Sequence, residues 1–338
     1  MTSTKLKTLA IGICAFAIVG VIFGASEEVP SWGGTLGGVF LGAVVGLLIM
    51  VLEVFVFPSN GLRPIDKLPL TIHFLIRLLS WIAVIFFVID LFGPPRTDPE
   101  WATSMAICLI LTFVAVSFIM VERIIGQTAL GNLLTGKYYR PKEAEFALLL
   151  IDLKGSTEIA DRIGNQKYFS FLDRFVTEAC DPIRANGGEI YKFVGDEIIA
   201  YWPADKNADL NGCSLAWNAM VLLFDKLGPS YEAEFGAKPT LRAAMHVGQL
   251  VIGQIGQYRQ EIAMLGEPMN AASRILALGG ERNIELVISE TANARIGNPS
   301  AFETHSLGKI LLRGCADELE LFSAQFPQTE QNSLPAQE

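Results

Sequence analysis

Four long apolar stretches in the first part of the chain are the feature that most constrains how it can fold. They cover about residues 8–24, 34–57, 71–92 and 102–121. A helix needs roughly 20 predominantly apolar residues to cross the hydrocarbon core of a bilayer. We therefore expect residues 1–121 to form an all-α transmembrane domain of four helices, with the lipid bilayer as its solvent.

Charges around these stretches predict their orientation. Basic residues precede the first stretch, lie between the second and third, and follow the fourth: Lys5, Lys7, Arg63, Lys67, Arg123, Lys137, Arg140 and Lys142. By the positive-inside rule, both termini are cytoplasmic and the protein belongs to the inner (plasma) membrane. The first stretch also fits a cleaved signal peptide, because small residues follow it at Gly24-Ala25-Ser26. The C-terminal part is cytoplasmic in either case.

Charged residues inside the apolar stretches allow two interpretations. Glu53 and Arg77 both lie near the inner ends of neighbouring stretches. A charge inside a membrane is costly and needs a partner, so the two side chains could form a salt bridge between helices. Alternatively, each side chain extends to the lipid headgroups independently.

Composition separates the chain into two parts. Of all residues 51% are apolar and 18% are charged, against roughly 25% charged in ordinary soluble domains. The net charge of −9 falls almost entirely after residue 130. An acidic second part has no basic surface for nucleic acid, so we expect no nucleic-acid partner. The cysteines are scattered without a CxxC pair, which argues against a disulfide framework and a zinc cluster.

Residues 122–143 are expected to be a cytoplasmic coupling helix and linker. The fourth apolar stretch continues into this segment with helical character, and glycines and a proline then end the helix. Residues 131–137 spell most of a phosphate-binding P-loop. However, Tyr138 replaces the required Ser or Thr and no strand precedes the segment, so we reject that motif. At the other end, residues 327–338 are expected to form a flexible tail.

The first motif with chemical meaning is centred on Asp152. A strand-length apolar run, residues 146–151, ends at this residue, and the small residues Gly155, Ser156 and Thr157 lead into an amphipathic helix. The carboxylate could hold a divalent cation while amides at the helix start bind phosphate oxygens. Taken alone, this is a weak signal, because an Asp before a Ser-Thr turn is more often an ordinary helix cap.

A second carboxylate strengthens the interpretation of the first. After a helix at about 166–186, two strands flank Gly195 and Asp196, which is the pattern of a β-hairpin. A hairpin beside the first strand would bring Asp196 to Asp152. Two carboxylates that share divalent ions are suited to in-line phosphoryl chemistry.

The third motif follows a pair of expected strands. Residues 242–248 are predicted to be a strand and residues 249–256 its hairpin partner. A helix then begins at Pro268, a residue favoured in the first helical turn. Asn270 and Arg274 are four residues apart and therefore lie on one face of that helix.

Together, the segments Ile-Asp-Leu-Lys-Gly-Ser-Thr, Tyr-Lys-Phe-Val-Gly-Asp-Glu and Leu-Gly-Glu-Pro-Met-Asn-Ala-Ala-Ser-Arg, in this order, resemble the class III nucleotidyl cyclases. The resemblance covers residues 144–326. It implies an α/β (α+β, ferredoxin-like) catalytic domain that follows the membrane domain. It also implies a homodimer in which two protomers pack head to tail and share their active sites.

The resemblance also assigns roles to individual residues. Asp152 and Asp196 match the metal-binding aspartates, with the Leu153 carbonyl as a further ligand, and two Mg²⁺ or Mn²⁺ ions are expected per site. The turn Gly155-Ser156-Thr157 would hold the β and γ phosphates. Asn270 matches the ribose-orienting asparagine, and Arg274 the arginine that balances charge in the transition state. Arg313 is the candidate for contact with the triphosphate, with Lys309 as a competitor.

The base-reading positions point to ATP with one exception. Lys192 matches the position at which adenylate cyclases carry Lys, and its ammonium can donate to adenine N1. The second base-reading position falls on Ala263, which has no polar atom. The implied activity is conversion of ATP to 3',5'-cyclic AMP and pyrophosphate. Two alternatives stay open: a guanylate cyclase, and a membrane receptor whose cyclase-like domain only binds nucleotide. The membrane domain would serve as an anchor or as the sensor of an unknown ligand.

Overall fold

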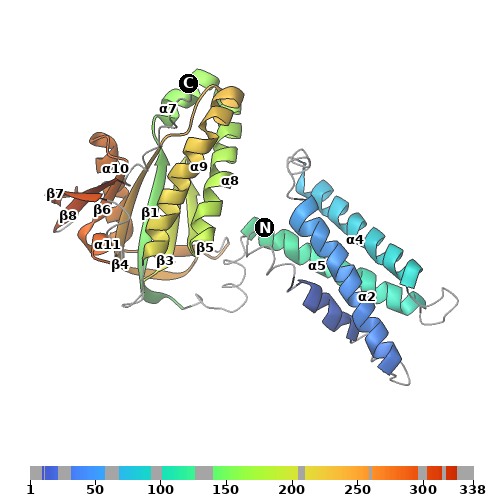
Figure 1. Cartoon of the computed structure of the whole chain (residues 1–338). Helices are drawn as coiled ribbons and strands as arrows, with labels where there is room; N and C mark the ends of the chain where they lie inside the picture. Colours follow the sequence, from blue (N-terminus) through green and yellow to red (C-terminus); the bar gives the residue numbers. More distant parts are fainter. Residues whose placement is uncertain are drawn as a thin grey trace, which may run out of the picture. The chain divides into compact units, whose positions relative to one another are not determined.

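The structure is a computed structural model, and it divides the chain into two compact units, Met1–Leu130 and Gly131–Glu338 (Figure 1). It describes residues 10, 12–21, 32–57, 68–92, 101–125, 140–204, 210–258, 261–295, 303–313 and 317–325.

All secondary-structure elements among the described residues of the first unit are helices. It contains a helix at Gly12–Val21, α2 (Trp32–Val51), a π-helical turn η1 (Leu52–Val56), α4 (Leu70–Phe92) and α5 (Trp101–Ile125). Two segments are long and apolar enough to cross a bilayer, Leu36–Val56 and Leu70–Phe92. The described apolar parts of the other two, Gly12–Val21 and Met105–Val121, are shorter. Of the four expected spans, the second and third stretches therefore form candidate spans, and a four-helix transmembrane domain is not confirmed.

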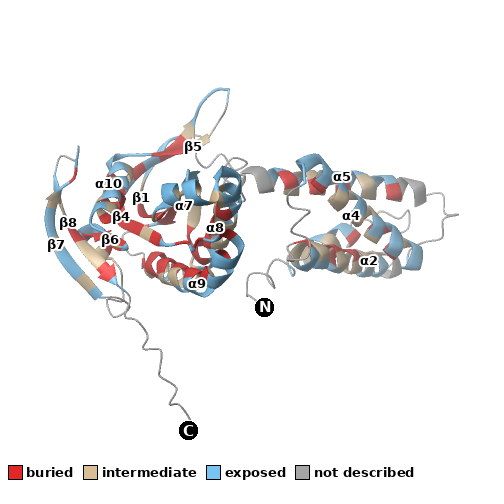
Figure 2. Ribbon diagram, turned by 90° about the horizontal axis from the view of Figure 1, so that it is seen from above, coloured by how far each residue is buried: buried red, intermediate tan, exposed pale blue. Residues whose placement is uncertain are grey.

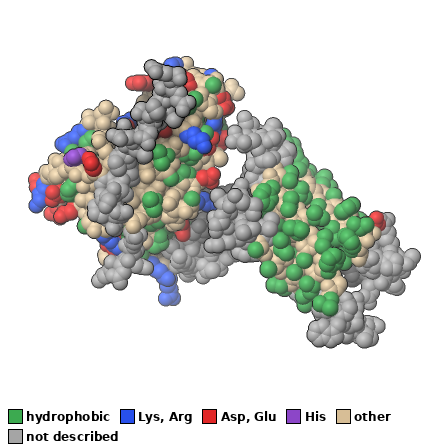
Figure 3. All heavy atoms as spheres, in the orientation of Figure 1, with side chains coloured by type: hydrophobic (Ala, Val, Ile, Leu, Met, Phe, Trp, Pro, Cys, Tyr) green, Lys and Arg blue, Asp and Glu red, His purple; other side chains and the backbone are tan. Residues whose placement is uncertain are grey.

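The surface of this unit is apolar. Phe87 and Ile110 are 64% and 63% exposed, and Figure 3 shows apolar side chains over the visible face of the helices. An exposed apolar surface of this extent is typical of helices solvated by lipid. α5 continues past residue 121 to Ile125, as the coupling-helix prediction requires. The rest of the expected linker up to residue 139, and the expected tail at 327–338, lie outside the described residues.

A buried ion pair joins η1 to α4. The Arg77 guanidinium lies 2.7 Å from the Glu53 carboxylate, and the two side chains are only 11% and 12% exposed. The Trp81 indole donates a further hydrogen bond of 3.0 Å to Glu53. Of the two interpretations left open by the sequence, the structure has the interhelical salt bridge, because Glu53 and Arg77 contact each other inside the unit.

The second unit is built on a mixed β-sheet. Its strands lie in the order β2-β3-β1-β4-β6-β8-β7, with β5 paired to β4. The elements are β1 (Lys142–Leu153), α7 (Ser156–Ile163), α8 (Asn165–Ala185), β2 (Glu189–Val194), β3 (Glu197–Pro203), α9 (Asn211–Phe235), β4 (Leu241–Ile255), β5 (Glu261–Leu265), α10 (Glu267–Glu281), β6 (Leu286–Ser289), α11 (Glu290–Asn293), β7 (Glu303–Leu311) and β8 (Glu318–Gln325). The chain order β-α-β-β-α-β with β2-β3-β1-β4 side by side is the expected ferredoxin-like arrangement.

Both faces of the sheet are covered by helices, which explains the continuous apolar run of β1. Leu149 and Ile151 belong to the core that α8 and α9 complete, whereas Leu148 and Leu150 belong to the core under α10. Figure 2 shows the buried residues following these central strands. Because side chains alternate along a strand, Asp152 falls on the face that carries α10.

One predicted turn is wrong. Residues 249–256 are not a hairpin partner of the strand before them, because β4 runs without interruption from Leu241 to Ile255. The reason is the role of Gly248: a side chain there would lie 2.4 Å from the ring of Pro268, so this glycine permits close packing of α10 and makes no turn. The turn comes after Gly256, whose φ is 93°, and the partner strand is β5.

Candidate active site

Two aspartates meet at one end of the sheet. Asp152 lies at the C-terminal end of β1, and Asp196 lies in the turn between β2 and β3, where Gly195 has a φ of 65°. Pairing of Ile151 with Ile198 places this turn beside the end of β1. Burial raises the pKa of Asp152, Arg242 opposes this rise, and the negative charge of Asp196 adds to it. The structure therefore brings together the two carboxylates predicted to bind metal.

Arg242 is a site residue that the sequence did not reveal. It pairs with Asp152 in the register of β1 and β4, and its Nε donates a 2.7 Å hydrogen bond to Asp152 Oδ2. A terminal guanidinium nitrogen donates to the same oxygen. The Asp152 side chain is only 13% exposed, so this contact supplies positive charge in a place with little water. β1 and β4 are far apart in the sequence, and no local sequence pattern reveals which of their residues pair.

The acidic end also contains Glu197. Its pKa is raised by burial and further by the charges of Asp152 and Asp196. Within the described ranges, no three His, Cys, Asp or Glu residues are arranged to hold a metal ion. Two crowded carboxylates nevertheless fit divalent cations, because hard oxygen ligands suit Mg²⁺ and Mn²⁺ and an ion relieves their mutual repulsion. Further ligands would come from backbone carbonyls, such as that of Leu153, and from substrate oxygens.

The turn after Asp152 has the conformation needed to start a helix. Gly155 is left-handed, with a φ of 67°, and α7 begins at Ser156 and Thr157. Amides in the first turn of a helix have no partner within the helix and favour anions. Tyr168, on α8, also belongs here: burial raises its pKa, the charge of Asp196 raises it further, and a hydrogen bond with Ser156 lowers it.

The positions predicted to read the base lie on β2 and β5. The Lys192 ammonium is 3.4 Å from a carboxylate oxygen of Glu261, and both side chains are nearly half exposed. Beside this pair, the Met264 amide donates a 3.0 Å hydrogen bond to the Tyr191 hydroxyl. Ala263 lies between these two contacts and is 5% exposed. The position that resembles the second base-reading residue therefore offers a buried methyl group.

Asn270 and Arg274 lie on α10, whose first turn contains Pro268 as predicted. Asn270 is exposed and Arg274 is partly buried. The N-terminal end of α10 packs on Gly248, whereas Gly280 near its C-terminal end lies against the Arg242 guanidinium. At about 1.5 Å per residue, Asn270 is about 15 Å along the helix from Gly280. One chain therefore does not bring Asn270 to the Asp152–Arg242 contact.

Arg313 is not brought to the aspartates by one chain either. It is exposed and follows β7, the edge strand at the other end of the sheet from β2. Its competitor Lys309 lies on β7 itself and pairs with Glu320 of β8 in the strand register. Within one chain, several strands of the sheet therefore separate both candidates for the triphosphate contact from the aspartates.

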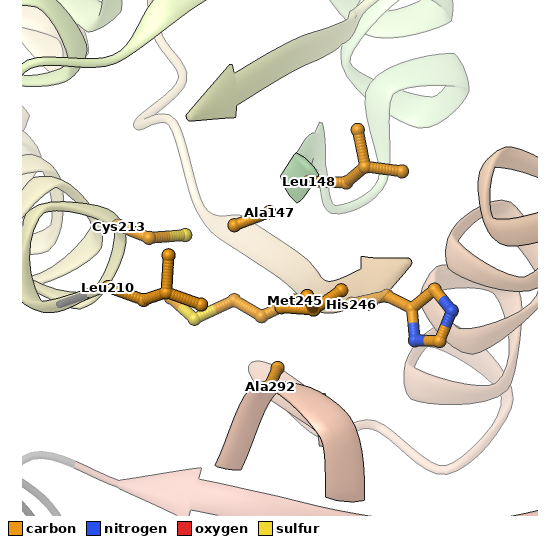
Figure 4. A pocket seen from close by; sticks show the side chains of 8 residues that line it. Ala147, Leu148, Leu210, Cys213, Met245, His246 and Ala292 are labelled. Atoms are coloured by element: carbon orange, nitrogen blue, oxygen red, sulfur yellow. The ribbon is translucent and has the colours of Figure 1, made fainter. Parts of the chain in front are cut away.

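A small internal gap lies beneath β4, away from these residues. Figure 4 shows it lined by Ala147, Leu210, Cys213, Met245 and Ala292, with His246 on the opposite side of the strand from Met245. His246 forms a 2.8 Å hydrogen bond with the Ser289 hydroxyl, and burial lowers its pKa. The gap has an apolar lining and nothing that would bind a charged nucleotide.

The fold and the paired aspartates define a class of protein. Residues 138–325 match the model of the adenylate and guanylate cyclase catalytic domain family. This match spans more than half of the chain, so the chain belongs to that family, and the resemblance to class III nucleotidyl cyclases is confirmed.

Curated relatives include two bacterial proteins. Adenylate cyclase 2 of Rhizobium meliloti is 29% identical over 203 residues, which cover 60% of this chain and 56% of that protein. An adenylate cyclase of Anabaena cylindrica is 25% identical over 187 residues, covering 53% of this chain and 36% of that protein. The chain thus spans about half or less of the length of these relatives.

Among solved structures, a bacterial light-regulated adenylyl cyclase has a TM-score of 0.55 at 15% identity. The match covers 68% of this chain and 67% of that one. At this identity the similarity establishes the fold alone.

Proposed function

We propose that the protein is a membrane-bound adenylate cyclase that converts ATP into 3',5'-cyclic AMP and pyrophosphate. The observation that carries the proposal is the meeting of Asp152 and Asp196 beside the glycine-led start of α7. The names of the relatives and the Lys at position 192 favour ATP as the nucleotide. The reaction joins the ribose 3'-oxygen to the α-phosphorus and breaks the bond from that phosphorus to pyrophosphate.

Asp152 and Asp196, with the Leu153 carbonyl, would hold two Mg²⁺ or Mn²⁺ ions. Bound there, such ions favour ionisation of the 3'-hydroxyl and balance the phosphate charge. The amides of Gly155, Ser156 and Thr157 would bind the β and γ phosphates at the start of α7.

Residues of α10 would act on the reacting atoms. Asn270 would orient the ribose, and Arg274 would donate hydrogen bonds to the α-phosphate oxygen as negative charge develops there. A planar guanidinium that is always charged suits this role. Lys192 would donate to adenine N1. Arg313 would meet the triphosphate from the partner copy.

The reaction requires two copies of the chain. In ATP the ribose and the α-phosphate are bonded neighbours, but Asn270 lies about 15 Å along α10 from the end that contacts Arg242. We infer that Asp152 and Asp196 of one copy work with Asn270 and Arg274 of the other, in a head-to-tail homodimer.

Mixing two inactive variants tests this arrangement. Asp152→Ala and Arg274→Ala each disable both sites of a homodimer, but a mixed dimer keeps one intact site. If subunits exchange freely, the mixture should recover about a quarter of wild-type activity, because about half of the dimers are mixed. A mixture that stays inactive after exchange is demonstrated would refute shared sites.

The activity itself is tested with the full-length protein in detergent, ATP and Mn²⁺, with cyclic AMP measured by mass spectrometry. Asp152→Asn should abolish the product. Asp173→Asn is the matched control, because Asp173 is an exposed carboxylate on α8 and lies between the buried residues Phe171 and Phe175, on the solvent side of the helix. The proposal fails if wild-type protein makes no cyclic AMP or if Asp152→Asn makes as much.

The membrane part is proposed to be a multi-pass domain of four spans over residues 1–121. The candidates Leu36–Val56 and Leu70–Phe92 and the apolar surface of the helices support it. We place both termini in the cytoplasm, with residues 122–143 as the linker, 144–326 as the catalytic domain and 327–338 as the tail. The membrane domain would anchor the catalytic domain at the plasma membrane or sense an unknown ligand.

A guanylate cyclase is the second candidate, and one observation favours it. Ala263 is buried and cannot accept a hydrogen bond from the amino group of adenine. Lys192 opposes it, because an ammonium cannot accept from guanine N1–H. Parallel assays with ATP and GTP distinguish the two activities.

A further inference from the structure

Tyr191 and Lys192 of β2, with Glu261 and Ala263 of β5, form what we call the base-reading surface. It contains a carboxylate, that of Glu261, to which the family resemblance assigns no role. Glu261 lies two residues before Ala263 on β5. A role for this carboxylate in reading the nucleotide base rests on the proposed cyclase function.

Strand geometry places Glu261 on the same side of β5 as Ala263. Side chains alternate along a strand, and the intervening Ile262 packs against the core under α10, as does Met264. Glu261 and Ala263 therefore point to the other side of the strand.

Two contacts hold this strand against β2. The Tyr191 hydroxyl accepts from the Met264 amide at 3.0 Å, and the Lys192 ammonium lies 3.4 Å from Glu261. A donor for adenine N1 and a carboxylate acceptor are thus side by side at the base-reading position.

The pair matches adenine in chemistry. On that base a hydrogen-bond acceptor, N1, lies next to a donor, the 6-amino group. An ammonium that donates to N1 therefore leaves the adjacent carboxylate to accept from the amino group. In guanine the same two places carry N1–H and the O6 oxygen, so Lys192 would meet a donor and Glu261 an acceptor.

We propose that Glu261 reads the 6-amino group of the substrate base, in place of the polar residue that Ala263 lacks. Glu261 also holds the Lys192 ammonium in position to donate. The alternative is an ordinary exposed ion pair, which contributes little to stability and nothing to nucleotide choice.

The experiment compares three nucleotides with full-length protein: ATP, GTP and purine riboside triphosphate, which lacks the 6-amino group. Values of kcat/KM are measured for wild type, Glu261→Ala and Glu261→Gln. Glu261→Ala should lose roughly ten- to hundredfold with ATP, the typical effect of a hydrogen bond to a charged group. It should lose a smaller factor with purine riboside triphosphate, which keeps N1 for Lys192 but has no 6-amino group for Glu261. Glu261→Gln keeps a carbonyl acceptor, so its kcat/KM with ATP should lie between those of wild type and Glu261→Ala.

Asp225→Asn is the matched control. It breaks an exposed ion pair of the same kind, Asp225 with Lys238 at 4.0 Å, outside the base-reading surface. This variant should leave all three kcat/KM values unchanged.

Two outcomes overturn the proposal. If Glu261→Ala loses the same factor with ATP and purine riboside triphosphate, Glu261 does not contact the 6-amino group. If it changes none of the values, the pair with Lys192 is only a surface ion pair.

Turnover of ATP by wild type tests the proposed function separately. If wild type makes no cyclic AMP, the cyclase proposal fails. The role of Glu261 in recognising the base is then tested by nucleotide binding. The nucleotides then compete with a fluorescent ATP analogue for binding in Ca²⁺, which replaces the turnover assay. In this assay Glu261→Ala should lose affinity for ATP by the same factor as expected for kcat/KM, and should lose less for purine riboside triphosphate.

Discussion

Replacing Arg242 by Gln tests whether the acidic end of the sheet is built to receive cations. Arg242 contacts Asp152 directly, whereas Asp196 and Glu197 add negative charge to the same partly buried space. Without the guanidinium, the carboxylates repel one another with less compensation. We expect a less stable protein that binds divalent cations more tightly, because a cation no longer competes with Arg242 for Asp152.

The expected size of the effect follows from the contact. Opposite unit charges about 4 Å apart attract by about 4 kcal/mol at an effective dielectric constant of about 20. The Arg242 and Asp152 side chains are 31% and 13% exposed, so both lose hydration and much of the attraction is cancelled. A net loss of about 1–2 kcal/mol remains. For a unit of this size, that corresponds to a fall in Tm of about 2–8 °C.

Calorimetry of full-length protein in detergent, with and without saturating Mn²⁺, measures this effect. Mn²⁺ should raise the Tm of Arg242→Gln more than that of wild type and so narrow the difference between them. Arg174→Gln is the control, because Arg174 contacts Glu178 at 3.0 Å and Glu234 at 2.7 Å in a network between α8 and α9. Its destabilisation should not depend on Mn²⁺. If the Tm difference between Arg242→Gln and wild type does not change with Mn²⁺ either, Arg242 does not compete with cations for Asp152.

Two further predictions concern buried charge. Burial lowers the pKa of His246 against the opposing charge of Glu267, so the unfolded chain binds a proton that the folded one excludes. Stability should therefore fall as the pH drops below about 6.5, and His246→Gln should weaken this dependence in calorimetry between pH 5 and 8. In the helical unit, Glu53→Gln removes the carboxylate that lies 2.7 Å from the Arg77 guanidinium and should lower the Tm in detergent by an amount corresponding to about 3 kcal/mol. Adding Arg77→Met should recover part of that loss, and a double variant less stable than Glu53→Gln would contradict this.

Local patterns in the sequence were sufficient for much of the catalytic unit. The apolar run before Asp152, the Gly195-Asp196 turn and the Pro268 helix start each depend on neighbouring residues, and the structure has them as predicted. The length of β4 was not predictable in this way. The sequence around Gly248 fits a turn and fits equally well a glycine that lets another element pack closely. Only the packing of α10 against Gly248 distinguishes the two roles.

The remaining site residues depend on contacts between distant segments. Arg242 reaches Asp152 through the register of β1 and β4, and Glu261 reaches Lys192 because the β4–β5 hairpin meets β2. Neither residue belongs to a local motif. For the helical unit, length and hydropathy indicated the spans, but the choice between a Glu53–Arg77 pair and separate charges depended on helix packing that no local pattern reveals.

The proposed division of the active site between two copies would give the proposed membrane domain a physical task. If Asp152 acts with Arg274 of another copy, a single chain is inactive however well it folds. Activity then depends on how often two catalytic domains meet, and confinement to a bilayer raises their effective concentration without any new contact. An anchor of this kind loses its effect once a soluble catalytic domain is concentrated enough to be fully dimeric. A sensor changes the balance between dimer conformations, and that effect persists at saturation. The specific activity of the truncated protein at high concentration, compared with that of the full chain, therefore separates the two roles.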